Sequence, residues 1–395
     1  MENQKKKSEL GLATRSIHVG ELEDIHGSPH TPIYTSTTFR FKDTASLLDV
    51  VDGKKQGSLY TRYGLNPSIF SVEQKLASLE QAEAAWVFCS GMAAEAALFL
   101  THGRKGIVCL GDAYGGTLEL LQQQLPLLGI PTYFLLGHEL DKLEDLLRTD
   151  KVGMVFFETP TNPTLEIFDI ATIAAQAHRH GALVAVDNTF ASPVNQQPLL
   201  FGADLVIHSA TKYLGGHSDL TAGVVMGSQA LLQPIWNWRK NLGQMPSPET
   251  AAKLSRSLKT LSVRVKQQNQ TAQYLAEKLL QHPRVQQVLY PGLPDFTGYE
   301  LAKQQMSGFG GMLSIVIDGD LESASQVADH LELFALAPSL GGVESLVTQP
   351  VTTTHHGLSS EERRQRGISD ALLRLSVGLE NAEDLYADLE QALKQ

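Results

Sequence analysis

Between residues 84 and 227, short apolar runs alternate with segments of helical periodicity. Runs rich in Val, Ile, Leu and Phe predict buried strands, and apolar residues spaced three and four apart predict helices. The expected strands are 86–89, 106–110, 132–136, 152–157, 182–186, 205–207 and 222–226, and the expected helices are 93–100, 115–128, 140–147 and 170–178. Repeated βα units of this length predict an α/β fold, with a mostly parallel central sheet and helices on both faces.

The pattern changes on both sides of this region. Residues 1–60 lack clear periodicity and predict an extended arm that contacts a neighbouring subunit. Ser247-Pro248 predicts a helix start, with Ser as the N-cap and Pro at the first helical position. We therefore expect a ligand-binding α/β domain over 61–246 and a smaller C-terminal α+β domain over 247–395.

The C-terminal third carries weaker strand and helix patterns. Residues 311–317 and 372–377 predict strands, and residues 322–331 predict a helix. A final helix should begin at Asn381, which resembles a capping box with Asp384.

Composition narrows the possible partners. The net charge of −11 disfavours nucleic acid, because phosphate binding needs a basic face. No run approaches the length of a membrane span, and the lysine-rich start has no apolar segment after it, so we expect no membrane contact and a cytoplasmic location. Cys89 and Cys109 both lie in apolar runs, which predicts two buried thiols in a reducing compartment.

Polar side chains follow three of the expected parallel strands. Glu158 and Asp187 each come directly after an apolar run, and a third run ends in Ser209, Thr211 and Lys212. Ligands of open α/β sheets bind at the carboxyl ends of the strands. Three signals at one edge of one sheet therefore favour a ligand site there.

Two of these residues suggest a particular chemistry. A partly desolvated Lys212 suits Schiff-base formation, because only the neutral amine attacks a carbonyl, although a surface lysine after a core strand fits the same pattern. A buried Asp187 needs a cation. A structural salt bridge would supply one, and so would the protonated ring nitrogen of a pyridine cofactor.

Other segments suggest anion binding. The strand–Ser90-Gly91-Met92–helix sequence suits a phosphate at a helix start, although Ser90 as a simple N-cap gives the same pattern. Tyr60 and Arg62 would share one face of an extended segment and could clamp a phosphate, or be an exposed pair.

Further motifs point to a carboxylate and away from other chemistry. Arg374 lies inside an expected strand, where it could bind a substrate carboxylate or a nearby structural acid. Dinucleotide, P-loop and hydrolase motifs are absent from the sequence, and His355-His356 lack metal-ligand spacing, so we expect no metal.

The motif from His208 to Asp219 and the ETPTNP segment at 158–163 together resemble the cysteine/methionine-metabolism family of pyridoxal-phosphate (PLP) enzymes, the trans-sulfuration group. The resemblance covers nearly the whole chain. It implies the PLP-dependent transferase type I fold, PLP as cofactor, an amino-acid substrate and a homotetramer built as a dimer of dimers.

The resemblance also implies roles for individual residues. Lys212 would form the Schiff base and move protons, Asp187 would partner the pyridine nitrogen, and Tyr114 would stack on the ring and act as an acid. Further contacts to the phosphate would come from Ser90, Gly91, Met92, Ser209 and Thr211, with Tyr60 and Arg62 donated by the neighbouring subunit. The substrate carboxylate would be held by Arg374, Ser339 and Asn162, with Glu158 near the cofactor.

The member of the family stays open. Gly116 stands where methionine γ-lyases often carry a cysteine, and Pro338 and the YPGLP at 290–294 resemble plant-type cystathionine γ-synthases. We expect a carbon–sulfur lyase or transferase acting at the γ carbon of an O- or S-substituted homoserine, of cystathionine γ-synthase or γ-lyase type. The alternatives are methionine γ-lyase, O-acetylhomoserine sulfhydrylase, cystathionine β-lyase, a transaminating enzyme and a non-catalytic PLP-binding protein.

Overall fold

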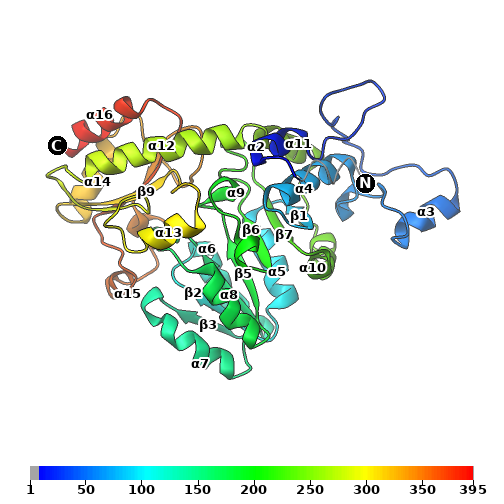
Figure 1. Cartoon of the computed structure of the whole chain (residues 1–395), viewed down its shortest axis with the longest axis horizontal. Coiled ribbons are helices and arrows are strands. Elements are labelled where there is room, and N and C mark those ends of the chain that lie inside the picture. The colour runs from blue at the N-terminus through cyan, green and yellow to red at the C-terminus, as the bar shows by residue number, and fades with distance from the viewer. Residues whose placement is uncertain (1–8, 395) are drawn as a thin grey trace.

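A seven-stranded sheet forms the centre of the molecule, seen in a computed structural model that describes residues 9–394 (Figure 1). Its strands are β1 Ala84–Phe88, β2 Ile107–Leu110, β3 Thr132–Leu135, β4 Met154–Glu158, β5 Leu183–Asp187, β6 Leu205–His208 and β7 Gly223–Gly227. They lie in the order β1-β7-β6-β5-β4-β2-β3, and only β7 runs antiparallel to its neighbours. The expected α/β fold with a mostly parallel sheet is confirmed.

Helices cover both faces of this sheet because each strand is apolar on both sides. Phe156 of β4 packs in the core with α5 Gly91–His102 and α10 Gln229–Asn241. Phe157 points to the opposite face, whose core includes α7 Leu143–Arg148 and α8 Ile170–Arg179. On that face α4 Pro67–Leu79 and α11 Pro248–Leu258 cover the β1–β7 end.

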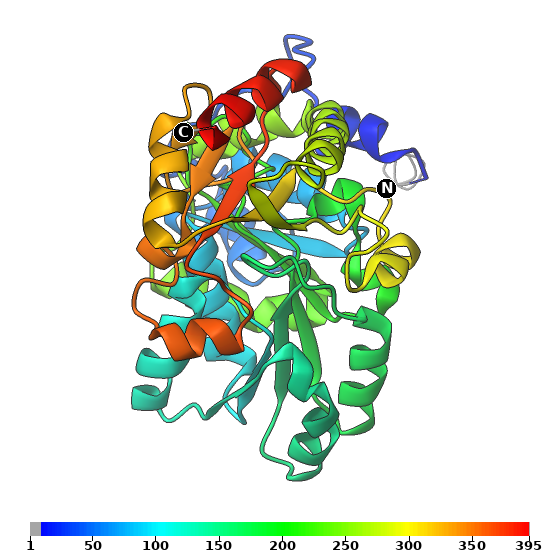
Figure 2. The same ribbon diagram turned by 90° about the vertical axis from the view of Figure 1, so that its left-hand side faces the viewer.

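The C-terminal third of the chain forms a second sheet, which has five strands (Figure 2). Its strands are β8 Val285–Leu289, β9 Met312–Ile317, β10 Ala335–Leu336, β11 Leu346–Thr348 and β12 Leu372–Ser376, in the order β10-β11-β12-β9-β8. The helices α12 Leu261–Leu279, α14 Leu321–His330 and α16 Ala382–Leu393 share its core. The first turns of α12 pack in the core beneath the first sheet, and its later turns pack in the core of the second sheet. This helix therefore joins the two sheets.

The remaining helices are short. They are α2 Leu12–His18, α3 Thr44–Val51, α6 Gly115–Glu119, α9 Ser192–Asn195, α13 Tyr299–Gln305 and α15 Ser360–Gln365. Single turns of 3₁₀ or π type lie at η1 Thr61–Tyr63, η2 Leu120–Gln124, η3 Pro126–Leu128, η4 Gly137–Lys142, η5 Pro198–Phe201 and η6 Pro350–Thr352. The domain limits at 60/61 and 246/247 stay predictions, and so does the role of the arm.

Several local expectations are wrong. The expected helix over 115–128 is interrupted by a π turn before Pro126, which cannot donate a backbone hydrogen bond. Asn381 is the N-cap of α16, but its side chain makes no capping hydrogen bond, so there is no capping box with Asp384. Cys89 is exposed rather than buried, whereas Cys109 is buried as expected and both thiols are free.

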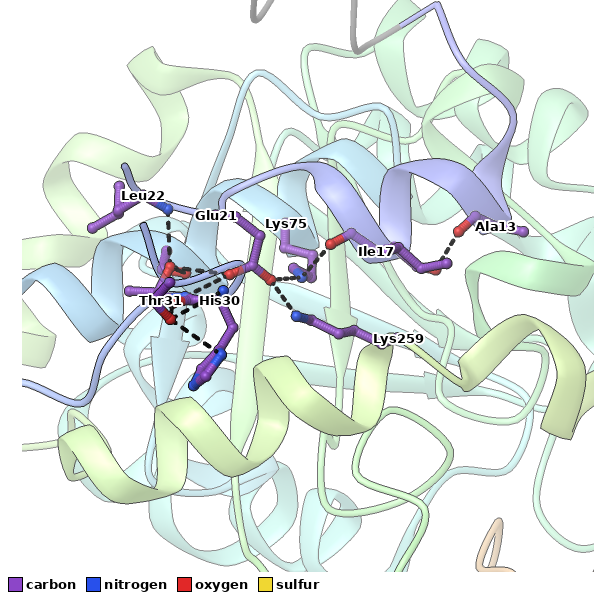
Figure 3. A network of polar contacts seen from close by, with 11 residues as sticks. Ala13, Ile17, Glu21, Leu22, His30, Thr31, Lys75 and Lys259 are labelled. Atoms are coloured by element: carbon purple, nitrogen blue, oxygen red, sulfur yellow. Dashed lines mark hydrogen bonds and ion pairs between the residues drawn. The ribbon is translucent and has the colours of Figure 1, made fainter. Parts of the chain in front are cut away.

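The N-terminal arm is more ordered than predicted, since it contains α2 and α3. Its first part is tied to the body at Glu21 (Figure 3). The Glu21 carboxylate lies 2.8 Å from Nζ of Lys75 on α4 and 2.8 Å from Nζ of Lys259 after α11. It also accepts hydrogen bonds from the backbone N–H and the hydroxyl of Thr31. One acid thus joins two stretches of the arm to two helices of the body.

We predict that Glu21→Gln lowers the free energy of unfolding by about 1–3 kcal/mol, because Lys75 is fully buried and would lose its carboxylate partner. Urea unfolding of Glu21→Gln measures this change. Asp52→Asn, which removes an exposed ion pair with Lys54, is the matched control and should leave stability nearly unchanged. Equal effects of the two substitutions would contradict the anchoring role of Glu21.

This stabilisation should also depend on pH. Burial raises the pKa of Glu21, but hydrogen bonds from Lys259 and Lys75 outweigh burial and hold the pKa at about 2, below its ordinary 4.5. A carboxyl group with a lowered pKa stabilises the fold fully above pH 4.5 and loses that contribution as the pH falls towards 2. The stability difference between the wild type and Glu21→Gln should shrink across that window.

Candidate active site

The carboxyl ends of β4, β5 and β6 bring the predicted acids together. Glu158 and Asp187 are the last residues of β4 and β5, and they pair in register across the sheet. Ser209 directly follows β6, and its backbone N–H donates to Oγ1 of Thr189 at 2.8 Å. Parallel strands therefore place three of the predicted site residues along one edge.

Asp187 is buried at this edge without a cation. The backbone N–H of Thr189 donates to its Oδ1 at 2.7 Å, and no Lys, Arg or His in residues 9–394 lies within ion-pair distance. Burial raises the pKa of Asp187 above its ordinary value, although the bonds from Thr189 oppose the rise. A structural salt bridge, the alternative left open by the sequence, is not present in the described chain.

Two further acids lie close to Asp187. Glu158 accepts a hydrogen bond from the backbone N–H of Tyr114 at 2.6 Å, and burial together with the charge of Asp187 raises its pKa well above the ordinary value. Glu95 of α5 accepts from the Thr117 hydroxyl at 2.7 Å, and burial and Asp187 raise its pKa to about 8. The sequence reading missed Glu95. The sequence pattern that could have indicated Glu95 is an acid inside the otherwise apolar helix that follows Ser90-Gly91.

The start of α5 meets the end of β6. Ser90 is the N-cap of α5 and accepts from the backbone N–H of Ala93 at 3.1 Å. A Cβ added at Gly91 would lie 3.0 Å from the Cβ of Ser209, so only glycine lets the two loops approach this closely. The Thr211 hydroxyl donates to the carbonyl oxygen of Ala222.

Met92 and Tyr114 lie on either side of Gly116. A Cβ at Gly116 would be 2.7 Å from the Tyr114 ring and 3.2 Å from the Met92 sulfur, so a larger residue would displace one of them. Tyr114 is 48% exposed, which leaves its ring accessible at the edge of the site.

Lys212 joins the first sheet to the loop before β11. Its Nζ donates to Oγ of Ser339 at 3.0 Å. Burial, helped by the charge of Arg374, lowers its pKa from 10.5 to about 8. A substantial fraction of this amine is therefore neutral near pH 8, as nucleophilic attack on a carbonyl requires.

Arg374 lies on β12 and is 5% exposed. Its Nη1 donates to Oδ1 of Asn162 at 2.9 Å and its Nη2 donates to the carbonyl oxygen of Ser339 at 3.0 Å. Burial lowers its pKa to about 10, and its Nε has no protein partner in the described chain. No acid within residues 9–394 forms an ion pair with Arg374, so the alternative of a structurally paired strand arginine is not what the structure shows.

Tyr60 and Arg62 lie apart from this group. The extended segment predicted for them is wrong, because residues 61–63 form the 3₁₀ turn η1. The Arg62 guanidinium stacks over the Tyr63 ring at 4.9 Å, and its Nη1 donates to the carbonyl oxygen of Lys240. The same guanidinium also lies 5.6 Å from the centroid of the Tyr60 ring, so the two residues contact each other. Neither has a hydrogen bond or ring contact with Lys212, Asp187 or the other predicted site residues of the described chain.

The described residues contain no group of three or more His, Cys, Asp or Glu that could hold a metal ion. His355 instead lies 2.9 Å from Asp112. Within the same residues, none of the helices combines the length and the apolar character that crossing a bilayer would require.

A model of the Cys/Met metabolism PLP-dependent enzyme family matches residues 13–394. The chain belongs to this family. It is 43% identical over 384 residues to the chloroplastic cystathionine gamma-synthase 1 of Arabidopsis thaliana, covering 96% of this chain and 68% of the relative. It is 42% identical over 396 residues to the L-methionine gamma-lyase of Pseudomonas deceptionensis, covering 98% of each chain.

Solved structures agree with the family assignment. The crystal structure of metB from Corynebacterium glutamicum has a TM-score of 0.92 and 40% identity, covering 98% of this chain and 99% of that one. The cystathionine gamma-lyase from Lactobacillus plantarum, solved with L-serine, has a TM-score of 0.90 and 38% identity over the same fractions. The chain is therefore a PLP-dependent trans-sulfuration enzyme, a lyase or transferase with the fold expected from the sequence.

The residues present fit PLP. Asp187 is a buried acid without a cation, which suits a protonated ring nitrogen, and Lys212 is a partly neutral amine, which suits an aldehyde. The helix start at Ser90 and Gly91 suits a phosphate. The assignment of individual residues to these roles remains a proposal.

We predict that Lys212 of the cofactor-free enzyme reacts with PLP at a rate that rises with pH and levels off above about 8. The neutral fraction of an amine grows as the pH approaches its pKa, and an ordinary lysine would not level off in this range. Borohydride reduction at each pH, followed by peptide mass mapping, measures the pyridoxyl adduct on Lys212. A rate still rising steeply at pH 10 would contradict the lowered pKa.

Proposed function

We propose that this enzyme acts at the γ carbon of an O- or S-substituted homoserine, in a γ-replacement or γ-elimination. The observation that carries the proposal is that Lys212 and Arg374 both donate hydrogen bonds to Ser339. An amine with a lowered pKa and a buried guanidinium are thereby held on the same residue. A guanidinium binds a carboxylate bidentately, so an amino acid held there would present its α carbon near the amine. The cystathionine gamma-synthase and methionine gamma-lyase names of the relatives support γ chemistry.

Each protein residue then has a defined task. Arg374, with Asn162 and the Ser339 backbone, binds the substrate carboxylate. The Lys212 amine takes the proton from the α carbon and returns protons to the substrate chain. PLP, when bound, supplies an electron sink for the charge that develops at the α carbon.

Other residues tune the cofactor or the leaving group. Asp187 would keep the ring nitrogen protonated, and Glu158 is the register partner of Asp187 on the neighbouring strand β4. Ser90, Gly91, Met92, Ser209 and Thr211 hold the phosphate. Tyr114, whose ring is accessible, would help to hold the cofactor and would donate a proton to the leaving group from its hydroxyl.

The phosphate site as described has hydroxyls and a helix start but no hydrogen-bonded cation among residues 9–394. Arg62 is exposed and lies outside its own site, so we propose that Tyr60 and Arg62 enter the site of a neighbouring subunit. The proposed assembly is a homotetramer built as a dimer of dimers.

A product assay tests the function. We predict that purified enzyme with PLP converts at least one of cystathionine, methionine or an O-acyl- or O-phosphohomoserine. Elimination would release 2-oxobutanoate, and replacement would consume an added thiol. Lys212→Ala should lower turnover by at least about 10³-fold, as expected when a proton-transferring group is removed. Pyruvate as the only product, formed from cystathionine or cysteine, would indicate β chemistry and contradict the proposal.

A second prediction tests whether Arg62 enters the site of a neighbouring subunit. Lys212→Ala and Arg62→Ala should each be nearly inactive alone, because each removes one part of every site. In a catalytic dimer that pairs one chain of each variant, one site receives both intact residues and the other receives neither, so this hybrid dimer should have about half of the wild-type activity. Coexpression that pairs the chains at random makes half of the dimers hybrid and should restore about a quarter. Hybrids as inactive as the parents would show that Arg62 does not act across subunits.

A further inference from the structure

Asp112 is a buried acid whose contacts have no role in the function proposed above. It is 4% exposed and lies in the loop between β2 and α6, two residues before Tyr114. Its Oδ2 lies 2.9 Å from Nε2 of His355, and its Oδ1 accepts from Nη1 of Arg366 at 2.8 Å. His355 is itself 1% exposed.

Both partners of Asp112 belong to residues 349–367, which we call the 349–367 segment and which joins β11 to β12. The Thr354 hydroxyl lies 2.8 Å from Nδ1 of His355, a bond that leaves Nε2 to donate to Asp112. Each oxygen of the Asp112 carboxylate therefore accepts a hydrogen bond from a side chain of the 349–367 segment, and Oδ1 also accepts one from the backbone N–H of Ala113 at 3.2 Å.

The 349–367 segment also touches the loop beyond Tyr114. A Cβ added at Gly115 would lie 2.6 Å from the carbonyl oxygen of Thr354, so the two backbones are in direct contact. The 349–367 segment thus contacts the chain on both sides of Tyr114, through the Asp112 side chain before it and the Gly115 backbone after it. The backbone N–H of Tyr114 itself donates to Glu158 at the end of β4, which is a third contact that holds this loop.

The other end of the segment is tied to the strand that carries Arg374. Nε of Arg363 donates to Oδ1 of Asp370 at 2.9 Å, and the Gln349 side chain donates to the carbonyl oxygen of Asp370. Asp370 lies two residues before β12. A continuous set of contacts therefore runs from the Tyr114 loop to the strand of Arg374.

We propose that Asp112, through His355 and Arg366, is a positioning residue that fixes Tyr114 relative to Arg374. The inference rests on the proposed function, in which Arg374 binds the carboxylate end of the substrate and Tyr114 serves the leaving-group end. A fixed spacing between those ends places the leaving group at the acid. A displacement of about 1 Å can slow a reaction about 100-fold.

The test is Asp112→Asn, which keeps the size of the side chain and removes its charge. We expect kcat to fall about 10- to 100-fold with KM changed less than about threefold, because Arg374 still binds substrate. The circular dichroism of the cofactor's visible band should also change, since the Tyr114 ring would shift. Glu361→Gln, an acid-to-amide change at an exposed ion pair of the same segment, is the matched control and should leave all three unchanged.

A double-mutant cycle shows whether Asp112 acts through Tyr114. Asp112→Asn combined with Tyr114→Phe should be no slower than Tyr114→Phe alone, whereas additive losses would overturn the proposal. If Asp112→Asn does not fold, His355→Gln replaces it with the same expectations. A folded variant with kcat within about twofold of wild type and unchanged dichroism would show a purely structural role.

Failure of the proposed function would look different. No turnover of any of the assayed amino acids by the wild type would refute that function. The dichroism of the cofactor band would still report whether Asp112 positions Tyr114.

Discussion

The burial of Asp187 without a cation is the constraint on which the site depends. A carboxylate in a low-dielectric interior is unfavourable unless a positive charge or hydrogen bonds compensate it. Here Thr189 supplies hydrogen bonds, while Glu158 and Glu95 add further acid nearby. A protonated ring nitrogen beside Asp187, as proposed, would supply the missing positive charge. In the proposed function, Asp187 would stabilise the ring in the charged form that draws electrons from the substrate.

The proposed substrate site depends on the contact between the two sheets. Lys212 follows β6 of the first sheet, and Arg374 lies on β12 of the second, with Ser339 in contact with both. Neither sheet alone could place an amine beside a guanidinium. The helix α12, whose two ends pack in the cores of the two parts, keeps their arrangement fixed. The chemistry is therefore a property of how the sheets meet, and contacts such as Asp112 with His355 matter although they lie outside the reacting groups.

The sequence predicted the parallel sheet well because its strands are apolar on both faces, a pattern that needs no tertiary information. It placed Asp187 and Lys212 correctly at strand ends for the same reason. It did not predict β8, whose Gln286 and Gln287 are exposed and break the apolar run. It also missed Glu95 as a site neighbour, since only the packing of α5 against the sheet brings that carboxyl near Asp187. Tyr60 and Arg62 show a further limit, because one chain alone does not contain the surroundings that we propose for them.

Arg374 has a second effect that follows from its position. Its charge contributes to the lowered pKa of Lys212, so the empty site favours the neutral, nucleophilic amine. In the proposed function, a substrate carboxylate bound to Arg374 would offset that charge and raise the pKa of Lys212. The amine is then a stronger base at the stage when it must remove the proton from the α carbon. If Arg374 binds the substrate as proposed, one buried guanidinium would favour the neutral amine before the substrate binds and a stronger base afterwards.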